Sequence, residues 1–244
     1  MLSEAILKVQ RANEHILELQ DAIRFLESKY TSTVERDQHT GVQELIHAAP
    51  NFGEDFRKLS LIIGDAVHNL HTALDYAWAA TIEKQVPMSA STFTKFPVRE
   101  TRALLEAALH GAAIDTGCPA LFNTIVSAIQ PYSGGNNDII WTLHKLDISD
   151  KHLLLLELTP TVSIKNIIMV DKDGQISHGS GIPVQNSGPY VIAFEPGVQI
   201  KERGKLAIEI TVKEAGIFKG VPVLDLLPTF SRYVAYVVQL LENL

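Results

Sequence analysis

The stretch LSLIIGDAVHNLHTALDYAW, residues 59–78, decides the fold. Apolar residues recur in it at every third or fourth position, which is the period of one face of an α-helix. That face consists of Ile62, Ile63, Ala66, Val67, Leu70, Ala73, Leu74, Ala77 and Trp78. The pattern extends over residues 54–84 and ends before Pro87, so we predict a long helix whose apolar face lies in the core.

The opposite face of this helix carries short polar side chains where long charged ones are usual. These side chains are Asp65, His68, Asn69, Thr72 and Asp75. They are poorer helix formers than Lys, Glu, Gln or Arg, and no Lys or Arg lies between Asp65 and Lys84. Two interpretations stay open: an ordinary solvated face, or a polar stripe that is buried or lines a cleft.

A second group of misplaced polar residues lies in WTLHKLDISDKH, residues 141–152. We predict a helix over residues 137–149, in which Asp147 projects into the apolar sector, and Asp150 projects into the same sector if the helix extends that far. A buried carboxylate must be paired, hydrogen-bonded, metal-bound or protonated. His144, Lys151 and His152 are the nearest partners in the sequence. In the alternative interpretation, Asp150 and Lys151 end the helix and are solvated.

The rest of the chain contains helices first, then strands, then a last helix. Further helices are predicted over residues 2–28, 99–109, 120–130 and 223–243, the last beginning properly at Pro228. A hairpin pairs residues 31–36 with 42–47 around DQHTG, and strands over 153–158, 162–170, 176–178, 190–194 and 205–212 form an antiparallel meander. These elements predict a single α+β domain over residues 1–244, a helical bundle packed against the meander with a C-terminal helix.

The composition excludes several classes of function. The 244 residues carry 21 Lys and Arg against 28 Asp and Glu, a net charge of −7, so no overall field attracts nucleic acid or an anionic membrane. The single cysteine, Cys118, forms no internal disulfide. Glu4 stands where a signal peptide needs basic residues, and no apolar run approaches the ~20 residues of a membrane span. We therefore expect a cytoplasmic protein without a membrane or nucleic-acid partner.

Four segments together resemble a family of bacterial proteins to which no activity is assigned. They are GDAVHNLHTALDYAWA from residue 64, Phe96-Pro97, the QPY of residues 130–132, and LHKLDISDKHLLL from residue 143. The family motifs are GDxxHNLRxALD and LxxLDxxDKHRLL. The resemblance covers the chain from about residue 62 to the last helix. This sequence has His71 and Leu153 where the family has Arg, so an anion-binding role of those arginines does not carry over.

The two polar groups predict one site between the long helix and the junction at residues 147–152. The candidates for catalysis are His68, Asp150 and His152, and those for binding a small polar ligand are Asp65, Asn69, Asp75 and Lys151. We predict that the site is a structural or ligand-binding network, and the alternative is a hydrolase of a small polar substrate that uses either a metal ion or metal-free acid–base chemistry. The acids are short Asp residues and not the Glu-x-x-His of carboxylate-bridged bundles, so no metal or other cofactor is predicted.

The last helix also predicts an assembly. Its apolar residues cover an arc of roughly 160°, which is wider than one packing contact hides. They are Leu227, Phe230, Tyr233, Val234, Val237, Val238, Leu240, Leu241 and Leu244. A two-fold partner is the commonest cover for such a face, so we predict a homodimer through this helix.

Overall fold

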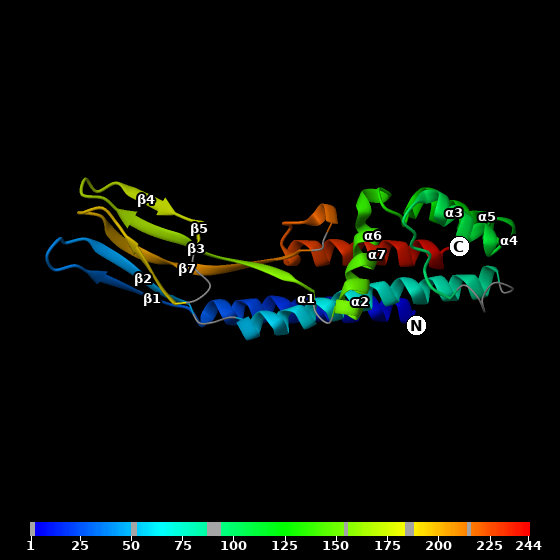
Figure 1. Ribbon diagram of the computed structural model, residues 1–244, viewed down its shortest axis with the longest axis horizontal. Coiled ribbons are helices and arrows are strands. Elements are labelled where there is room, and N and C mark those ends of the chain that lie inside the picture. The colour runs from blue at the N-terminus through cyan, green and yellow to red at the C-terminus, as the bar shows by residue number, and fades with distance from the viewer. Residues whose placement is uncertain (1–2, 50–52, 87–93, 154–155, 184–187, 214–215) are drawn as a thin grey trace. The chain divides into compact units, whose positions relative to one another are not determined.

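The computed structural model describes residues 3–49, 53–86, 94–153, 156–183, 188–213 and 216–244. It is 56% helical and 23% strand, which confirms the α+β class. The helices are α1 (Glu4–Ser28), α2 (Gly53–Gln85), α3 (Arg102–Gly111), α4 (Ile114–Gly117), α5 (Pro119–Asn123), α6 (Ile139–Leu153) and α7 (Val223–Glu242) (Figure 1). Among the described helices, none combines the length and the apolar character that crossing a bilayer requires.

The chain divides into two compact units. Unit 1 consists of Met1–Glu18, Ser60–Glu157 and Val212–Leu244, and unit 2 of Leu19–Leu59 and Leu158–Thr211. Unit 1 is helical, whereas unit 2 holds the strands together with the end of α1 and the start of α2. The division does not decide the prediction of a single domain, because α1 and α2 each continue from one unit into the other.

The core of unit 1 forms around the predicted apolar face of α2. Every residue of that face is buried except Ile62, which is half-buried. Helix α7 packs its apolar side inside the same unit, and it spans Val223–Glu242, which confirms the predicted helix over residues 223–243, without the later start at Pro228. Buried side chains on both sides of the proline, Leu227 and Phe230, hold the helix together where a backbone hydrogen bond is missing.

Helix α6 is longer than the sequence predicts. It runs to Leu153, and β3 begins only at Leu158. The predicted strand over residues 153–158 is therefore wrong at its start, because Leu153 is the last residue of the helix. Leu154 and Leu155 lie outside the described residues. An ion pair between Asp147 and Lys151, one helical turn apart, stabilises the additional turn. The predicted helix over residues 120–130 is divided into α5 and a π-helix at Thr124–Ile129.

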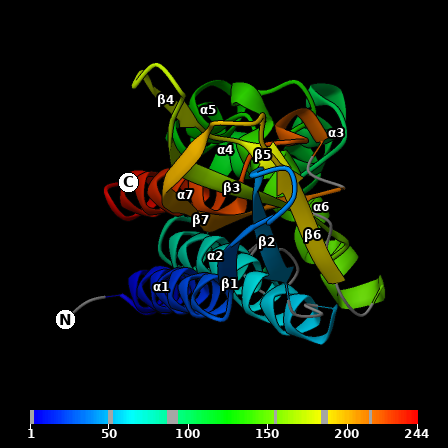
Figure 2. The ribbon, with the colours of Figure 1, turned by 90° about the vertical axis from the view of Figure 1, so that its left-hand side faces the viewer.

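The strands of unit 2 form two antiparallel sheets (Figure 2). They are β1 (Thr31–Arg36), β2 (Gln43–Ala49), β3 (Leu158–Val170), β4 (Ile176–Gly179), β5 (Ile182–Pro183), β6 (Gly188–Ala193) and β7 (Gln199–Val212). The predicted hairpin is confirmed as β1 and β2, with Arg36 opposite Gln43. Instead of continuing one meander, β6 pairs with β2, while β3 pairs with β4, β5 and β7.

Candidate functional site

The predicted site lies within unit 1, where α6 crosses α2 (Figure 1). The central group is Asp147, whose side chain is only 3% exposed. Its Oδ1 lies 2.9 Å from His68 Nδ1, and its Oδ2 accepts a hydrogen bond of 2.6 Å from Lys151 Nζ. The inward direction predicted for Asp147 is therefore confirmed.

Asp147 is ionised in spite of its burial. Burial raises the pKa of this carboxyl group, but the hydrogen bonds from Lys151 and His68 outweigh that effect and hold the pKa below its ordinary value. An ionised carboxylate only accepts hydrogen bonds, so the proton of the His68 contact belongs to Nδ1. In neutral His68 the lone pair is then on Nε2.

His68 is partly open to solvent. Its side chain is 47% exposed, and Nε2 lies 3.5 Å from the hydroxyl of Thr72, one turn further along α2. A buried carboxylate that orients one ring nitrogen, with the other nitrogen accessible, is the arrangement of a general base.

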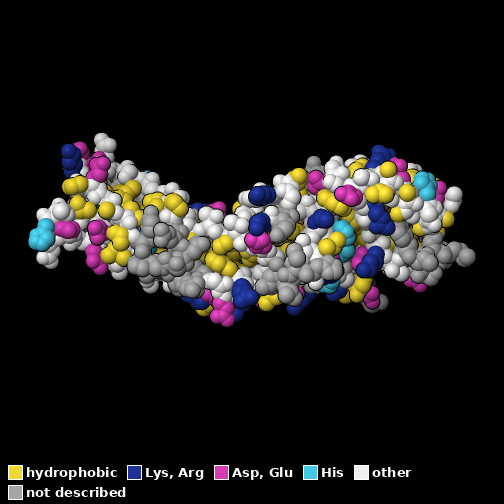
Figure 3. Space-filling view, viewed as in Figure 1, with side chains coloured by type: hydrophobic (Ala, Val, Ile, Leu, Met, Phe, Trp, Pro, Cys, Tyr) yellow, Lys and Arg dark blue, Asp and Glu magenta, His cyan; other side chains and the backbone are white. Residues whose placement is uncertain are grey.

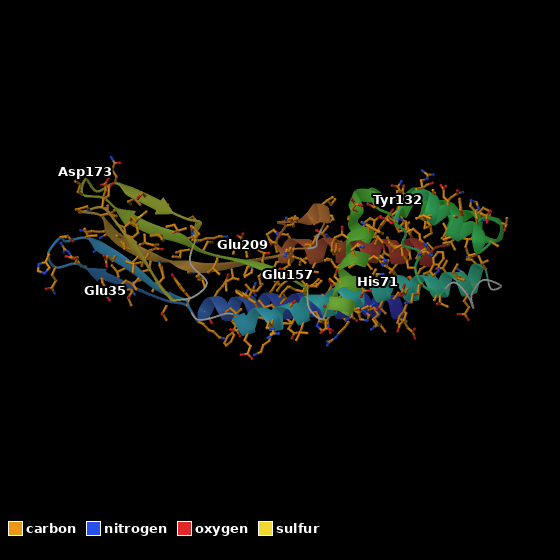
Figure 4. The ribbon with its side chains drawn as sticks, viewed as in Figure 1. Glu35, His71, Tyr132, Glu157, Asp173 and Glu209 are labelled. Atoms are coloured by element: carbon orange, nitrogen blue, oxygen red, sulfur yellow. The ribbon has the colours of Figure 1, made fainter. Side chains whose placement is uncertain are left out.

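A second histidine, His71 (Figure 4), is buried and also lies close to Asp147. Its Nε2 lies 3.0 Å from His144 Nδ1, and the two rings stack with centroids 5.2 Å apart. Its Nδ1 lies 3.5 Å from Asp147 Oδ2 and 3.8 Å from Asp75 Oδ2, without a hydrogen bond among the described residues. These carboxylates favour a proton on Nδ1, so His144 donates to His71.

Burial keeps this histidine pair neutral at neutral pH. It lowers the pKa of His71, against the attraction of Asp147 and Asp75. It also lowers the pKa of His144 to about 4, and a charge on His71 would lower it further. His71 was not among the site residues predicted from the sequence. Its burial could have been predicted from its position, because it lies seven residues before the buried Trp78 and only about 20° away from it around the helix.

Asp150 lies against α2 at its only glycine in the segment 59–78. A Cβ atom built on Gly64 would lie 2.7 Å from Asp150 Cγ and 2.8 Å from Oδ2, so no larger residue fits without movement. Burial raises the pKa of Asp150, and the charges of Asp147 and Asp65 raise it further. The side chain of Asp150 makes no hydrogen bond to the residues that the structure describes.

The other predicted residues divide into two groups. Lys151 joins the site through Asp147, whereas the Asn69 side chain donates to the Asp65 carbonyl and accepts from Lys8 Nζ at 3.2 Å. Asp75 instead accepts a hydrogen bond of 2.9 Å from the Phe96 backbone N–H. His152 belongs to α6, and its side chain lies outside the described residues.

The arrangement combines an oriented imidazole with a buried carboxylate, two groups that can take part in proton transfer. In the described part of the chain, no three His, Cys, Asp or Glu residues are placed to hold a metal ion. A mainly apolar cavity of about 360 Å³ lies further along α2, at Tyr76, Ala80 and Lys84. Tyr76 is eight residues from His68, about 12 Å along the helix, so a molecule confined to that cavity does not reach His68.

Comparison with known proteins gives no relative for this site. No family model, curated protein or solved structure matches the chain. The resemblance described above therefore stays a prediction.

Proposed function

We propose that His68 and Asp147 form an acid–base pair that hydrolyses a small polar substrate without a metal ion. One observation carries the proposal: an accessible imidazole is tied through Nδ1 to a carboxylate that is only 3% exposed. In water the electrostatic interaction between such a carboxylate and an imidazolium is weak. Burial of the carboxylate strengthens this interaction, fixes the tautomer of His68 and stabilises the imidazolium that forms during proton transfer.

The neighbouring groups fit the two halves of such a reaction. His68 Nε2 would take a proton from a water molecule, whose oxygen would attack the acyl carbon of the substrate. Asp150, with its raised pKa, would supply a proton to the leaving oxygen. Lys151 and Asn69 would bind polar groups of the substrate, since Lys151 keeps N–H groups that its bond to Asp147 does not use.

A second candidate is a purely structural network that fixes how α6 packs on α2. It is favoured by the same carboxylate, because Asp147 contacts Lys151 of its own helix as well as His68 and His71 of α2. A structural network needs no accessible nitrogen, so the exposed half of His68 distinguishes the two candidates.

The test is hydrolysis of 4-nitrophenyl acetate by the whole chain and by His68→Gln. His110→Gln is the matched control. His110 Nδ1 lies 2.8 Å from Asp115 Oδ2, and its side chain is 54% exposed, but the side chain of Asp115 is 28% exposed whereas that of Asp147 is only 3% exposed. We expect His68→Gln to lose at least about tenfold in rate, and His110→Gln to keep the rate.

The hydrolysis rate of His68→Gln separates the candidates. This variant loses a hydrogen bond to the Asp147 carboxylate in both of them, at a cost of about 1.5–3 kcal/mol in the free energy of unfolding. Equal hydrolysis rates in the whole chain and both variants would favour the structural network and contradict the proposal.

A small ligand also agrees with the charge distribution. On the face shown in Figure 3, Lys and Arg side chains alternate with Asp and Glu, without a broad surface of one sign.

We propose the cytoplasm as the location and a homodimer as the assembly, with light-scattering mass as the test of the latter. Val234, Val237 and Val238 of α7 are already buried inside one chain, so a dimer would use other residues of this helix.

A further inference from the structure

We propose that unit 2 contains a binding site for a small oxyanion, centred on Arg36. The site is a cavity of about 190 Å³ between the β1–β2 hairpin and the turn before β7. Arg36, Thr40, Gly41, Gln43, Gly197 and Gln199 line it. This volume holds several water molecules, and therefore also an anion of the size of phosphate or a small carboxylate.

The sheet register places Arg36 on the side of the hairpin away from the nearest glutamates. Arg36 pairs with Gln43, and Glu35 pairs with Glu44. Paired residues of an antiparallel ladder share a face, and successive residues alternate between faces. Arg36 and Gln43 therefore face the cavity together, while Glu35 (Figure 4) and Glu44 belong to the other face. No described carboxylate forms an ion pair with Arg36.

The polar groups around Arg36 have their acceptor atoms occupied. Gln43 Oε1 accepts 2.7 Å from the Ile200 N–H, and Gln199 Oε1 accepts 3.1 Å from Lys201 Nζ. Both partners only donate, which fixes the orientation of each amide and leaves its NH₂ group as a donor. Thr40 Oγ1 accepts 3.3 Å from the Val42 N–H, so its hydroxyl proton also remains available.

The one acid in the hairpin turn does not offset this donor set. Asp37 Oδ1 accepts from the His39 and Thr40 N–H groups at 2.7 and 2.8 Å, and these backbone bonds hold its pKa below the ordinary value. Its charge is therefore engaged within its own turn. A cavity that offers a guanidinium, two amide NH₂ groups and a hydroxyl matches the acceptor oxygens of an oxyanion.

Two glycines shape the cavity wall. Gly41 and Gly197 have φ angles of +71° and +93°, which side chains other than glycine rarely adopt. A Cβ atom on Gly41 would lie 3.7 Å from Arg36 Nη2, so this guanidinium lies directly over the hairpin turn. The wall is thus backbone that a ligand can approach closely.

The test is titration of the whole chain with inorganic phosphate and, separately, with succinate, by calorimetry and by ¹⁵N–¹H NMR. We expect saturable binding of at least one of them, with the amide signals of Gly41 and Gly197 shifting most. Binding of phosphate alone assigns the site to phosphate groups, and binding of succinate alone assigns it to carboxylates.

Arg36→Gln should weaken binding at least about tenfold, because the bidentate charged contact is lost. Arg57→Gln is the control, since Arg57 is an exposed arginine of the same unit away from the cavity, and we expect unchanged binding. Absence of saturation up to about 10 mM of both anions, equal weakening by the two substitutions, or shifts away from Gly41 and Gly197 in the unsubstituted chain would overturn the proposal. The NMR result does not depend on the folding of any variant.

Discussion

Replacement of Gly64 by alanine tests how closely α6 packs on α2. In an open helical position this change stabilises by up to about 1 kcal/mol through helix propensity. Here the new Cβ would lie 2.7 Å from Asp150 Cγ and 2.8 Å from Oδ2, and overpacking of this kind costs about 1–3 kcal/mol. We expect Gly64→Ala to lower the free energy of unfolding by about 1–2 kcal/mol.

Asp150→Ala removes the atoms that the new methyl group would meet. In that background Gly64→Ala should become neutral or stabilising, so the double-mutant cycle should give a coupling free energy of about 2 kcal/mol. The assay is urea unfolding of the four proteins, with linear extrapolation to water. Gly111→Ala is the control, because nothing lies within 4 Å of a Cβ at that helical glycine, and it should not destabilise.

The outcome that refutes this reasoning is specific. If Gly64→Ala raises stability as Gly111→Ala does, α6 and α2 are not in close contact at this point. If Gly64→Ala is equally destabilising with and without the Asp150 carboxylate, the cost arises elsewhere in α2.

Two further predictions concern buried groups. Burial lowers the pKa of His47, which is 0% exposed and whose two ring nitrogens have no hydrogen-bond partner among the described residues, from 6.5 to about 4. The unfolded chain then binds the proton more strongly, so this group lowers the free energy of unfolding by about 3 kcal/mol as the pH falls from 6.5 to 4. In His47→Phe the free energy of unfolding, measured with urea, should change less over this pH range. A profile with unchanged slope in His47→Phe would contradict this assignment. Val237→Glu buries a charge at a position that is 0% exposed and should destabilise by at least about 3 kcal/mol, whereas Tyr236→Glu on the exposed side should cost less than about 1 kcal/mol. A Val237→Glu variant that is as stable as the unsubstituted chain would contradict the burial of Val237 in the core.

Local patterns in the sequence were sufficient for most elements and for part of the site. The 3.6-residue period predicted α2 and its buried face, and the turn residues predicted the β1–β2 hairpin. The same period predicted the inward direction of Asp147. Each of these features depends on residues within one or two turns of each other, which is the range over which such patterns carry information.

Features that depend on distant residues could not be predicted in this way. Alternation indicates a strand but not its partner, so the pairing of β6 with β2 was missed. Whether His68 is solvated or paired depends on Asp147 in another helix. His71 was overlooked because a histidine at the edge of an apolar face has the same sequence pattern whether it is exposed or buried.

The His68–Asp147 contact has a consequence for the order of folding. It joins two residues 79 positions apart, so closing that loop costs chain entropy before the hydrogen bond forms. Each helix forms by local contacts in microseconds or less, whereas docking of distant segments is slower. A newly made chain therefore acquires its helical content before it acquires an oriented imidazole. The proposed acid–base pair is therefore complete only once α6 has docked on α2.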